Sequence, residues 1–579
     1  MRRHPGKRTE PLPARVAIPA WLRPLLVLIS CLILTGLFSR EITNSDFWWQ
    51  LRTGQYIWQT HSLPDPDPFA YTTAMARDAY AGEGATRRFN LTHEWLTQVL
   101  LYLAYRTTGF GGIVLIRAGL LVAFCVIAGL VAYRRCDGFY RSLAATFAAA
   151  AVAYPFVADR PFLVTFVLLA ASLAILEWRK PALLWVMPFL MLIWANCHGG
   201  FVLGWVVMGA YSAEALFFRL RGRPEAGDIR LWVVCAASVL VSGLNPNGFR
   251  IVPVLLNYHN SFLQSNLIEW GPPSLWPPTA FSVLLVGAAA ALLWARRRAR
   301  LADWLLFLAF AAAALSAGRN TFLIGLLAPV LMAAYLPWKI PVKAYAEIGA
   351  AALLVVGLGV TCASGQSFQL HAAEWAYPAG AADFLLSHSI TGRMFNTYEY
   401  GGYLTWRLWP QERVFIDGRA LSESVFADYG RILYNAGGRD GKSASQLLDQ
   451  YGVQVVVMNT FEYTSGVPYV LAGALADPEN MGWKLVYADP HAMVFLRHPP
   501  DEMPVLDSSQ VLATMESECD LHMQHEPQFP GCARNLGQIF SNTGDFANAR
   551  RWLGVYLAHA PGRDPEAEEA FRRMVAAGK

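Results

Sequence analysis

Charged residues are scarce in this chain of 579 residues, of which Asp, Glu, Lys and Arg make up only 15%. Soluble globular domains usually carry about a quarter charged residues, so this scarcity argues against a soluble enzyme. Cysteine is also scarce: eight residues are too few for a disulfide-built scaffold, and no Cys-x-x-Cys pair suggests structural zinc. The net charge of +5 is too small to predict a nucleic-acid partner.

Apolar residues are what the chain has in abundance, with 55% hydrophobic residues and a mean hydropathy of +0.31. The 20 Trp and 23 Tyr residues would suit aromatic belts at two membrane interfaces. Apolar runs separated by short basic clusters predict about eleven transmembrane helices, and hence a polytopic α-helical membrane protein. The runs lie at 24–39, 111–133, 143–158, 161–178, 182–197, 200–218, 231–245, 278–295, 304–318, 321–337 and 345–363.

The basic residues predict the orientation of these helices. Lys and Arg recur in every second loop, for example at Arg134-Arg135, Arg179-Lys180 and Arg296–Arg298. Cytoplasmic loops carry the excess of Lys and Arg, so the basic N-terminus (1–23) is predicted to be cytoplasmic. Everything after the transmembrane domain (24–364) is then predicted to lie outside.

The first outer loop, 40–110, carries polar and aromatic motifs. It opens with Ser45-Asp46-Phe47-Trp48-Trp49, passes through a proline-rich stretch and reaches His93-Glu94-Trp95. Apolar residues then follow at helical spacing from Leu96 to Ala104. This pattern predicts an amphipathic helix in the interface plane before the second span.

Two regions follow the last span. Alternating helix and strand patterns predict an extracytoplasmic α/β domain at 365–500 with a partly parallel sheet. We expect helices at 378–388, 398–408, 422–435 and 443–451, and strands at 393–396, 414–417, 453–459, 484–488 and 492–497. The tail, 501–579, is predicted to be helical and resembles one tetratricopeptide (TPR) repeat with companion helices at 508–526 and 564–577. A disulfide between Cys519 and Cys532 is possible there, because that compartment would be oxidising.

Polar residues collect on the predicted outer side of the membrane region. Each has an ordinary explanation: a tryptophan in a belt, Asp46 as a helix cap, or an arginine that snorkels to the interface. The functional interpretation depends on the whole set being on one side, where it would form a polar cavity. The set is Asp46, Trp49, His93, Glu94, Trp95, Asn196, His198, Asn245 and Glu269, with Arg117, Arg160 and Arg319 at or near outer helix ends.

Several motifs of the chain together carry a resemblance to a known family. They are Asp46-Phe47-Trp48-Trp49-Gln50-Leu51-x-x-Gly54, His93-Glu94-Trp95-Leu96, Arg160-Pro161, Asn196-x-His198-Gly199-Gly200-Phe201, Leu244-Asn245-Pro246, Glu269-Trp270, Arg319-Asn320, Tyr398-x-x-Gly401-Gly402-Tyr403-Leu404 and Phe415-Ile416-Asp417-Gly418-Arg419. This pattern resembles bacterial integral membrane proteins of the GT-C glycosyltransferase class, a class that includes protein O-mannosyltransferases, the aminoarabinose transferase of lipid A and oligosaccharyltransferases. The resemblance covers about residues 24–500. It implies a multispan fold with a carboxylate in the first outer loop, a polyprenyl-phosphate sugar donor and a soluble outer domain.

The resemblance also implies roles for single residues. Asp46 matches the acidic position that deprotonates or orients the acceptor, with Glu94 or His93 as its helper. Arg160, Arg319 and Arg117 would neutralise the departing phosphate. The sequence has no clear Asp-x-Asp metal motif, since Asp65-Pro66-Asp67 has the pattern of a loop. No cofactor is therefore certain, although a divalent metal is possible.

The function expected from the sequence is transfer of a sugar from a polyprenyl-phosphate donor to a lipid, glycan or protein acceptor. It would take place at the outer face of a bacterial inner membrane, with no nucleic-acid partner. The alternative is a non-catalytic scaffold or a lipid-handling or transport protein that recruits protein partners through the TPR-like tail. A transporter should have internal repeats and charges at the bilayer midplane, and neither is evident in the sequence.

Overall fold

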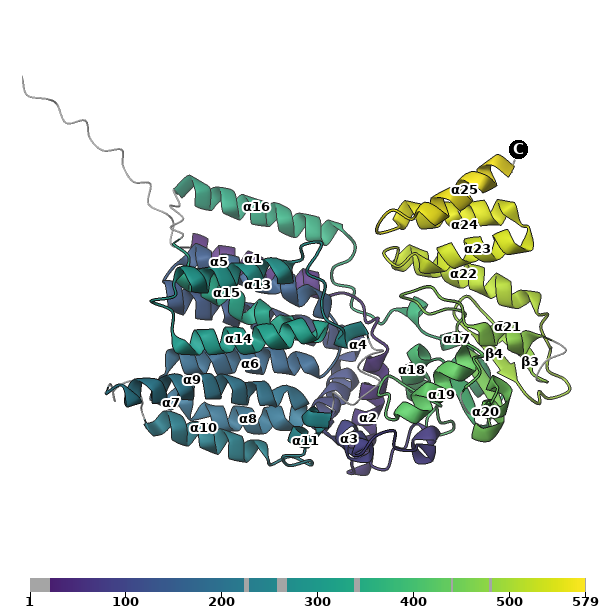
Figure 1. Cartoon of the computed structure of the whole chain (residues 1–579), viewed down its shortest axis with the longest axis horizontal. Helices are drawn as coiled ribbons and strands as arrows, with labels where there is room; N and C mark the ends of the chain where they lie inside the picture. Colours follow the sequence, from purple (N-terminus) through teal and green to yellow (C-terminus); the bar gives the residue numbers. More distant parts are fainter. Residues whose placement is uncertain are drawn as a thin grey trace, which may run out of the picture.

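A computed structural model describes residues 21–222, 229–257, 268–337, 344–438, 441–477 and 482–577. Most of the predicted cytoplasmic segment 1–23 lies outside these residues. The described chain has a bundle of long helices, followed by a smaller α/β domain and a helical tail that stacks on it (Figure 1). Residues 40–110, the predicted first outer loop and named the first outer segment from here on, contribute helices that lie between the bundle and the α/β domain (Figure 1).

Each of the eleven apolar runs forms helix. By length and composition, three described stretches are long and apolar enough to cross a membrane, Glu83–Cys136, Gly199–Leu220 and Gly318–Tyr335, and seven further apolar helices are shorter. These helices indicate a membrane protein, whereas the count of eleven spans stays a prediction. The bundle helices are α1 (Leu22–Phe38), α4 (Trp95–Cys136), α5 (Phe139–Ala153), α6 (Phe162–Trp178), α7 (Pro181–Leu184), α8 (Val186–Cys197), α9 (Val202–Leu220), α10 (Ile229–Ser242), α11 (Ile251–Asn257), α13 (Ala280–Trp294), α14 (Leu301–Ser316), α15 (Phe322–Tyr335) and α16 (Ala344–Ala363).

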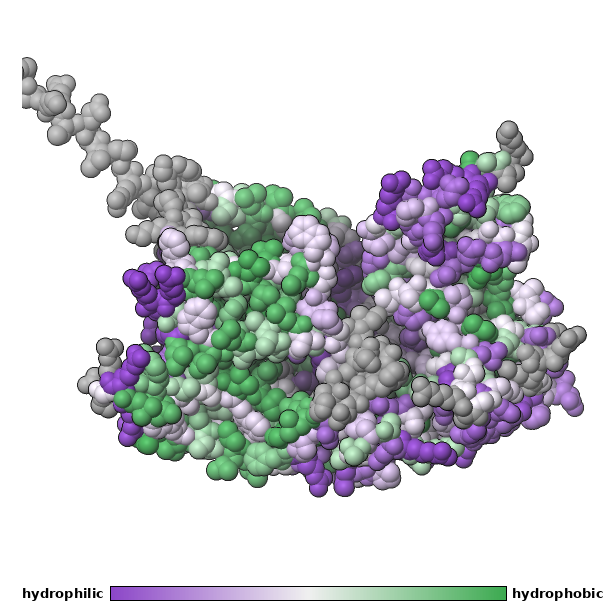
Figure 2. Space-filling view, viewed as in Figure 1, coloured by the Kyte–Doolittle hydropathy of each residue, from purple (hydrophilic) through white to green (hydrophobic). Residues whose placement is uncertain are grey.

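The bundle is apolar both inside and outside. Glycines let its helices approach closely: a Cβ at Gly129 would lie 2.0 Å from Thr146 Oγ1, and one at Gly325 would lie 3.0 Å from Val152. Small residues at contacts are typical of helices that pack within lipid. The outward surface is also largely hydrophobic (Figure 2), as on α16, where Leu353 is 74% exposed. A helix that is apolar all round is expected where lipid replaces water.

An ion-pair network ties several bundle helices together at the ends that lie away from the first outer segment. Arg135 on α4 pairs with Asp303 on α14 at 2.7 Å and with Glu177 on α6 at 3.1 Å. Arg300 pairs with the same two carboxylates. Each of these charges has an oppositely charged partner, so the polar residues at these helix ends have a structural role.

The first outer segment is more helical than the sequence indicated. It contains α2 (Asp46–Thr60), a short 3-10 turn η1 (Tyr71–Met75) and α3 (Glu83–Thr92), none of which was predicted. The predicted amphipathic helix forms the first part of α4, which bends at Gly109, where φ is +64°. Glycine suits this bend because side chains disfavour positive φ.

Within the described residues of the α/β domain, four strands form a sheet in the order β1-β2-β4-β3. Strand β1 (Met394–Asn396) is parallel to β2 (Val455–Met458), whereas β4 (Met493–Leu496) is antiparallel to both β2 and β3 (Lys484–Ala488). The sheet is therefore partly parallel, as the sequence predicted. The helices are α17 (Ala379–Ser387), α18 (Tyr398–Leu408), α19 (Glu423–Leu433), α20 (Ala444–Tyr451) and the unpredicted α21 (Val470–Ala476).

The predicted strand at 414–417 is wrong. Only Val414 pairs, through an isolated bridge to Ala70 of the first outer segment. The Asn396 side chain forms hydrogen bonds with the backbone groups that would otherwise pair with a neighbouring strand. Its Oδ1 accepts from Phe415 N–H at 2.8 Å, and its amide donates to Ile416 O at 2.8 Å. The apolar side chains of the segment are buried all the same, which explains why the sequence resembled a strand.

The tail consists of α22 (Ser509–His525), α23 (Gly531–Thr543), α24 (Phe546–His559) and α25 (Pro565–Ala577). A disulfide joins Cys519 on α22 to Cys532 on α23. The tail packs closely on the α/β domain, because a Cβ at Gly531 would lie 2.1 Å from Ser465 O. Membership of the TPR class and a protein partner stay predictions.

Candidate functional site

A cavity of about 790 Å³ lies where the bundle, the first outer segment and the α/β domain meet. Its volume is within the range of small-molecule sites. One part of its wall is ionic, with Asp46, Arg160, Glu269 and Arg319. Another part is apolar and comes from α6, α9 and α15, with Phe162, Phe166, Leu203, Phe322 and Leu323 among its residues.

Asp46 is the first residue of α2 and is only 8% exposed. Its Oδ1 accepts a hydrogen bond from Trp49 Nε1 at 3.0 Å, and its Oδ2 lies 2.7 Å from Arg160 Nη2. Burial raises the pKa of the Asp46 carboxyl above its usual range, against the opposing effects of Arg160 and Trp49. The result is a fixed carboxylate whose basicity is increased, which suits a general base.

The Arg160 guanidinium contacts three side-chain oxygens, one of which is Asp46 Oδ2. Its Nε also donates to Asn44 Oδ1 at 3.0 Å, and its Nη1 donates to Glu269 Oε2 at 3.0 Å. Burial lowers the pKa of Arg160, but Asp46 and Glu269 outweigh that effect and raise it overall. The guanidinium therefore stays charged and fixes the position of Asp46.

Arg319 is the more available cation. Its Nη1 lies 3.9 Å from Glu269 Oε1, at the limit of an ion pair, and its guanidinium stacks over Trp270 at 4.2 Å. Its side chain is 32% exposed. An anionic group in the cavity could therefore pair with Arg319 more easily than with Arg160, whose contacts to carboxylates are shorter.

The α/β domain approaches Asp46 through glycine. A Cβ at Gly418 would lie 1.6 Å from Asp46 Oδ1, and a Cβ at Gly402 would lie 2.4 Å from Ser45 O. Tyr398 Oη donates to Gly418 O at 3.0 Å and holds that backbone in place. These glycines permit close approach between two regions that are distant in sequence.

An ion-pair cluster holds this contact together. The Arg419 guanidinium donates to Asp417 and, at 2.8 Å, to Asp67 of the first outer segment, and the three side chains are 1–3% exposed. Asp65 pairs with Arg88 at 2.8 Å. Both carboxylates of the Asp65-Pro66-Asp67 sequence are therefore paired with arginines.

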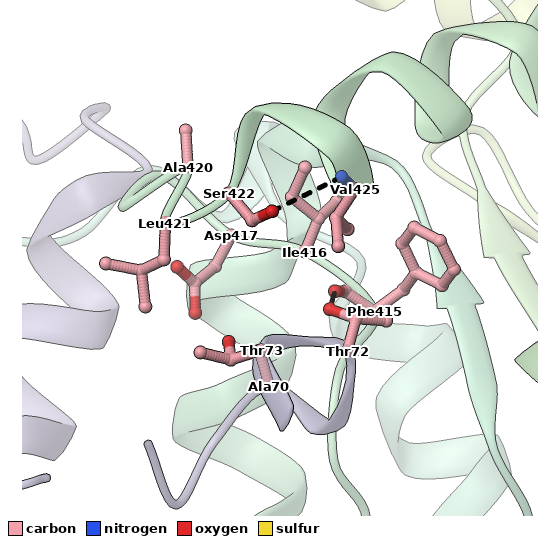
Figure 3. Close-up of a pocket in the computed structure, with 10 residues that line it drawn as sticks. All are labelled: Ala70, Thr72, Thr73, Phe415, Ile416, Asp417, Ala420, Leu421, Ser422 and Val425. Atoms are coloured by element: carbon pink, nitrogen blue, oxygen red, sulfur yellow. Dashed lines mark hydrogen bonds between the residues drawn. The ribbon is translucent and has the colours of Figure 1, made fainter. Parts of the chain in front are cut away.

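A small cavity of about 20 Å³ is lined by Asp417, Thr72 and the start of α19 (Figure 3). Ser422 Oγ caps α19 by accepting from Val425 N–H at 3.4 Å, as Figure 3 shows. This space suits a single water molecule and marks the boundary between the first outer segment and the α/β domain.

Glu94 forms a second polar centre in the same cavity. Its Oε2 accepts from Gln50 Nε2 at 2.7 Å, and its Oε1 lies 3.3 Å from His93 Nε2 and 3.6 Å from His198 Nε2. His198 Nδ1 accepts from Gly200 N–H at 3.0 Å, so the proton of a neutral His198 ring is on Nε2, facing Glu94. Gln50 lies one helical turn after Asp46 and so links the two carboxylate centres through α2.

The structure brings most of the predicted residues together, but four have other surroundings. Arg117 and Asp159 form a buried ion pair, with side chains 2% and 1% exposed. Trp95 donates to Asn196 Oδ1 at 2.9 Å, and Asn245 donates to two backbone carbonyls of its own turn. None of Arg117, Trp95, Asn196 and Asn245 is among the described residues that line the cavity.

The sequence did not assign roles to Asn44, Gln50 or Tyr398. Gln50 and Tyr398 belong to motifs that carried the family resemblance, but those motifs did not indicate what either side chain contacts. Within the described part of the chain, no group of three or more His, Cys, Asp or Glu side chains is arranged to hold a metal ion.

No protein-family model and no curated protein sequence matches this chain. Among solved structures, the chain resembles the Archaeoglobus fulgidus oligosaccharyltransferase tethered with an acceptor peptide containing the NVT sequon via a disulfide bond. The TM-score is 0.50 at 12% identity, over 84% of this chain and 75% of that one. It also resembles AglB of the same organism in complex with an inhibitory peptide and a dolichol-phosphate, with a TM-score of 0.49 at 11% identity over 86% and 77% of the two chains. At these identities the likeness concerns the fold alone.

Proposed function

We propose that this chain, with its oligosaccharyltransferase-like fold, transfers a sugar from a polyprenyl-phosphate donor to a lipid, glycan or protein acceptor. The reaction would take place at the outer face of a bacterial inner membrane. The observation that carries the proposal is the division of the cavity wall into an ionic part around Asp46 and an apolar part made by bundle helices. A polyprenyl phosphate has the same two parts, a charged head and a long apolar tail.

The proposed step forms a bond between the acceptor oxygen and the sugar and breaks the bond between the sugar and the phosphate oxygen. The acceptor proton goes to Asp46, and polyprenyl phosphate leaves with the bonding electron pair. Asp46 suits this role because it is held by Arg160 and Trp49 and because burial raises its pKa. A positioned base of this kind contributes about 10²–10⁴-fold to the rate.

The arginines have different proposed roles. Arg160 contacts Asp46 directly, so we assign it to orienting the base. The ion-pair contact of Arg319 with Glu269 is long, at 3.9 Å, so we assign Arg319 to the phosphate of the donor. Glu94 with His93 and His198 is assigned to holding acceptor hydroxyl groups.

The experiment compares wild type with Asp46→Asn in membranes supplied with radiolabelled polyprenyl-phosphate sugars. Wild type should release polyprenyl phosphate, and the variant should be slower by about 10²–10⁴-fold. Asp449→Asn is the matched control, because Asp449 is half exposed and pairs only with Arg497 among the ion pairs of the described chain. Equal release by all three proteins would remove Asp46 from the mechanism, and no release by folded wild type with any donor would favour lipid handling without chemistry.

A further inference from the structure

We propose that the Arg160 guanidinium is a built-in cation of the cavity and takes the place of a divalent metal ion. The inference depends on the charges around Asp46 and not on the proposed transfer reaction. A divalent metal would need oxygen or nitrogen ligands that are free of other cations. The oxygens around Asp46 do not meet that requirement.

Three oxygens that could ligate a metal already bind the guanidinium. Asp46 Oδ2, Glu269 Oε2 and Asn44 Oδ1 each contact a different nitrogen of Arg160, at 2.7, 3.0 and 3.0 Å. Carboxylate and amide oxygens are the ligands that hard divalent cations prefer. Arginine is permanently charged and covalently attached, so it neutralises these oxygens without depending on metal supply.

Three further acidic residues beside the cavity wall are also paired with arginine. Arg419 holds Asp67 and Asp417, and Arg117 holds Asp159, with side-chain exposures of 1–3%. A metal ion at either place would have to displace a buried guanidinium and leave that charge unpaired, which is strongly unfavourable.

The Glu94 centre is unsuited to metal for a different reason. A metal on His198 Nε2 would require the ring proton to sit on Nδ1. However, Gly200 N–H points at Nδ1 from 3.0 Å, so two donors would face each other. Glu94 and His93 then remain as only two ligands, too few for a structural or catalytic metal site.

The structure offers an optical test of this inference. Trp49 Nε1 donates to Asp46 Oδ1, and the Trp270 ring stacks with Arg319, whose guanidinium reaches Glu269, so tryptophan lies close to the oxygens around Arg160. Terbium(III) is a hard cation that accepts excitation energy from nearby tryptophan and then luminesces. Purified protein in detergent is therefore titrated with Tb³⁺ in four forms: wild type, Arg160→Ala, Arg160→Lys and the double variant Arg160→Ala with Asp46→Asn.

Wild type and Arg160→Lys should show only the background luminescence of the double variant, because a side-chain cation still occupies the site. Arg160→Ala should gain an EDTA-reversible signal above that background, since three oxygens lose their cation. Thermal unfolding of each form identifies folded samples, and Arg160→Met replaces Arg160→Ala if the alanine variant does not fold.

Two results would overturn the inference. One is Tb³⁺ luminescence in wild type above the background of the double variant, since the oxygens would then already accept a metal. The other is a folded Arg160→Ala or Arg160→Met protein that gains no signal over the double variant. Failure of the proposed sugar transfer is recognised separately, as wild type without turnover; where turnover is present, EDTA should leave it unchanged.

Discussion

Replacing Gly418 with alanine should displace the carboxylate of Asp46. The new Cβ would lie 1.6 Å from Asp46 Oδ1 and 3.1 Å from Trp49 Nε1, whereas non-bonded heavy atoms prefer separations of about 3.5 Å. The 417–419 backbone cannot easily retreat, because Arg419 is buried with Asp67 and Tyr398 holds Gly418 O. The short side chain of Asp46 is therefore the part that moves.

The size of the effect follows from the contacts that this movement breaks. Asp46 would lose its hydrogen bond from Trp49 and its 2.7 Å contact with Arg160. Hydrogen bonds to charged groups contribute about 1.5–3 kcal/mol each, and overpacking costs about 1–3 kcal/mol. A displacement of about 1 Å in a catalytic group can lower the rate about 10²-fold, so turnover should fall by at least that factor.

The assay is release of polyprenyl phosphate, measured together with the thermal midpoint in detergent. Gly430→Ala is the matched control, because Gly430 lies in α19 of the same domain and its added Cβ would meet nothing within 4 Å. That control should keep wild-type turnover and gain up to about 1 kcal/mol of stability. Equal turnover in Gly418→Ala and Gly430→Ala would refute the reasoning that the α/β domain constrains Asp46.

Four further changes separate structural from functional residues. Arg319→Ala should leave the thermal midpoint nearly unchanged and lower kcat/KM by about 10²–10³-fold, because a cation for the phosphate is lost. Arg117→Leu should instead destabilise the fold by about 3–5 kcal/mol in a denaturation assay, since it leaves a buried carboxylate unpaired. Cys519→Ser should lower the stability of the tail by about 3 kcal/mol, given the 13-residue separation between the bridged cysteines, and limited proteolysis should then cut the tail faster. Burial raises the pKa of the Glu518 carboxyl to about 8 in the folded protein, so the contribution of the protonated carboxyl to stability is full below about pH 4.5 and is lost as the pH rises through 8. The thermal midpoint should therefore fall over this pH range, and Glu518→Gln should make it less dependent on pH.

Much of the fold could be predicted from the sequence. The apolar runs specified the bundle helices because helix formation and burial in lipid both depend on local composition. The alternating helix and strand patterns also predicted α18, α19 and α20 close to their observed bounds. The segment at 414–417 shows the limit of this reasoning, since an apolar run can be buried as a loop when the Asn396 side chain supplies the hydrogen bonds of a neighbouring strand.

The candidate site divides in the same way. The sequence by itself determined which polar residues lie at one end of the membrane helices, because helix length and loop order fix the ends on which they fall. Only the tertiary structure decided that Arg160 binds Asp46 and Glu269, that Arg117 pairs with Asp159, and that Gly418 touches Asp46. These pairs join segments more than a hundred residues apart in most cases, and an ion pair or a close contact depends on angstrom-scale positions that local sequence patterns do not encode.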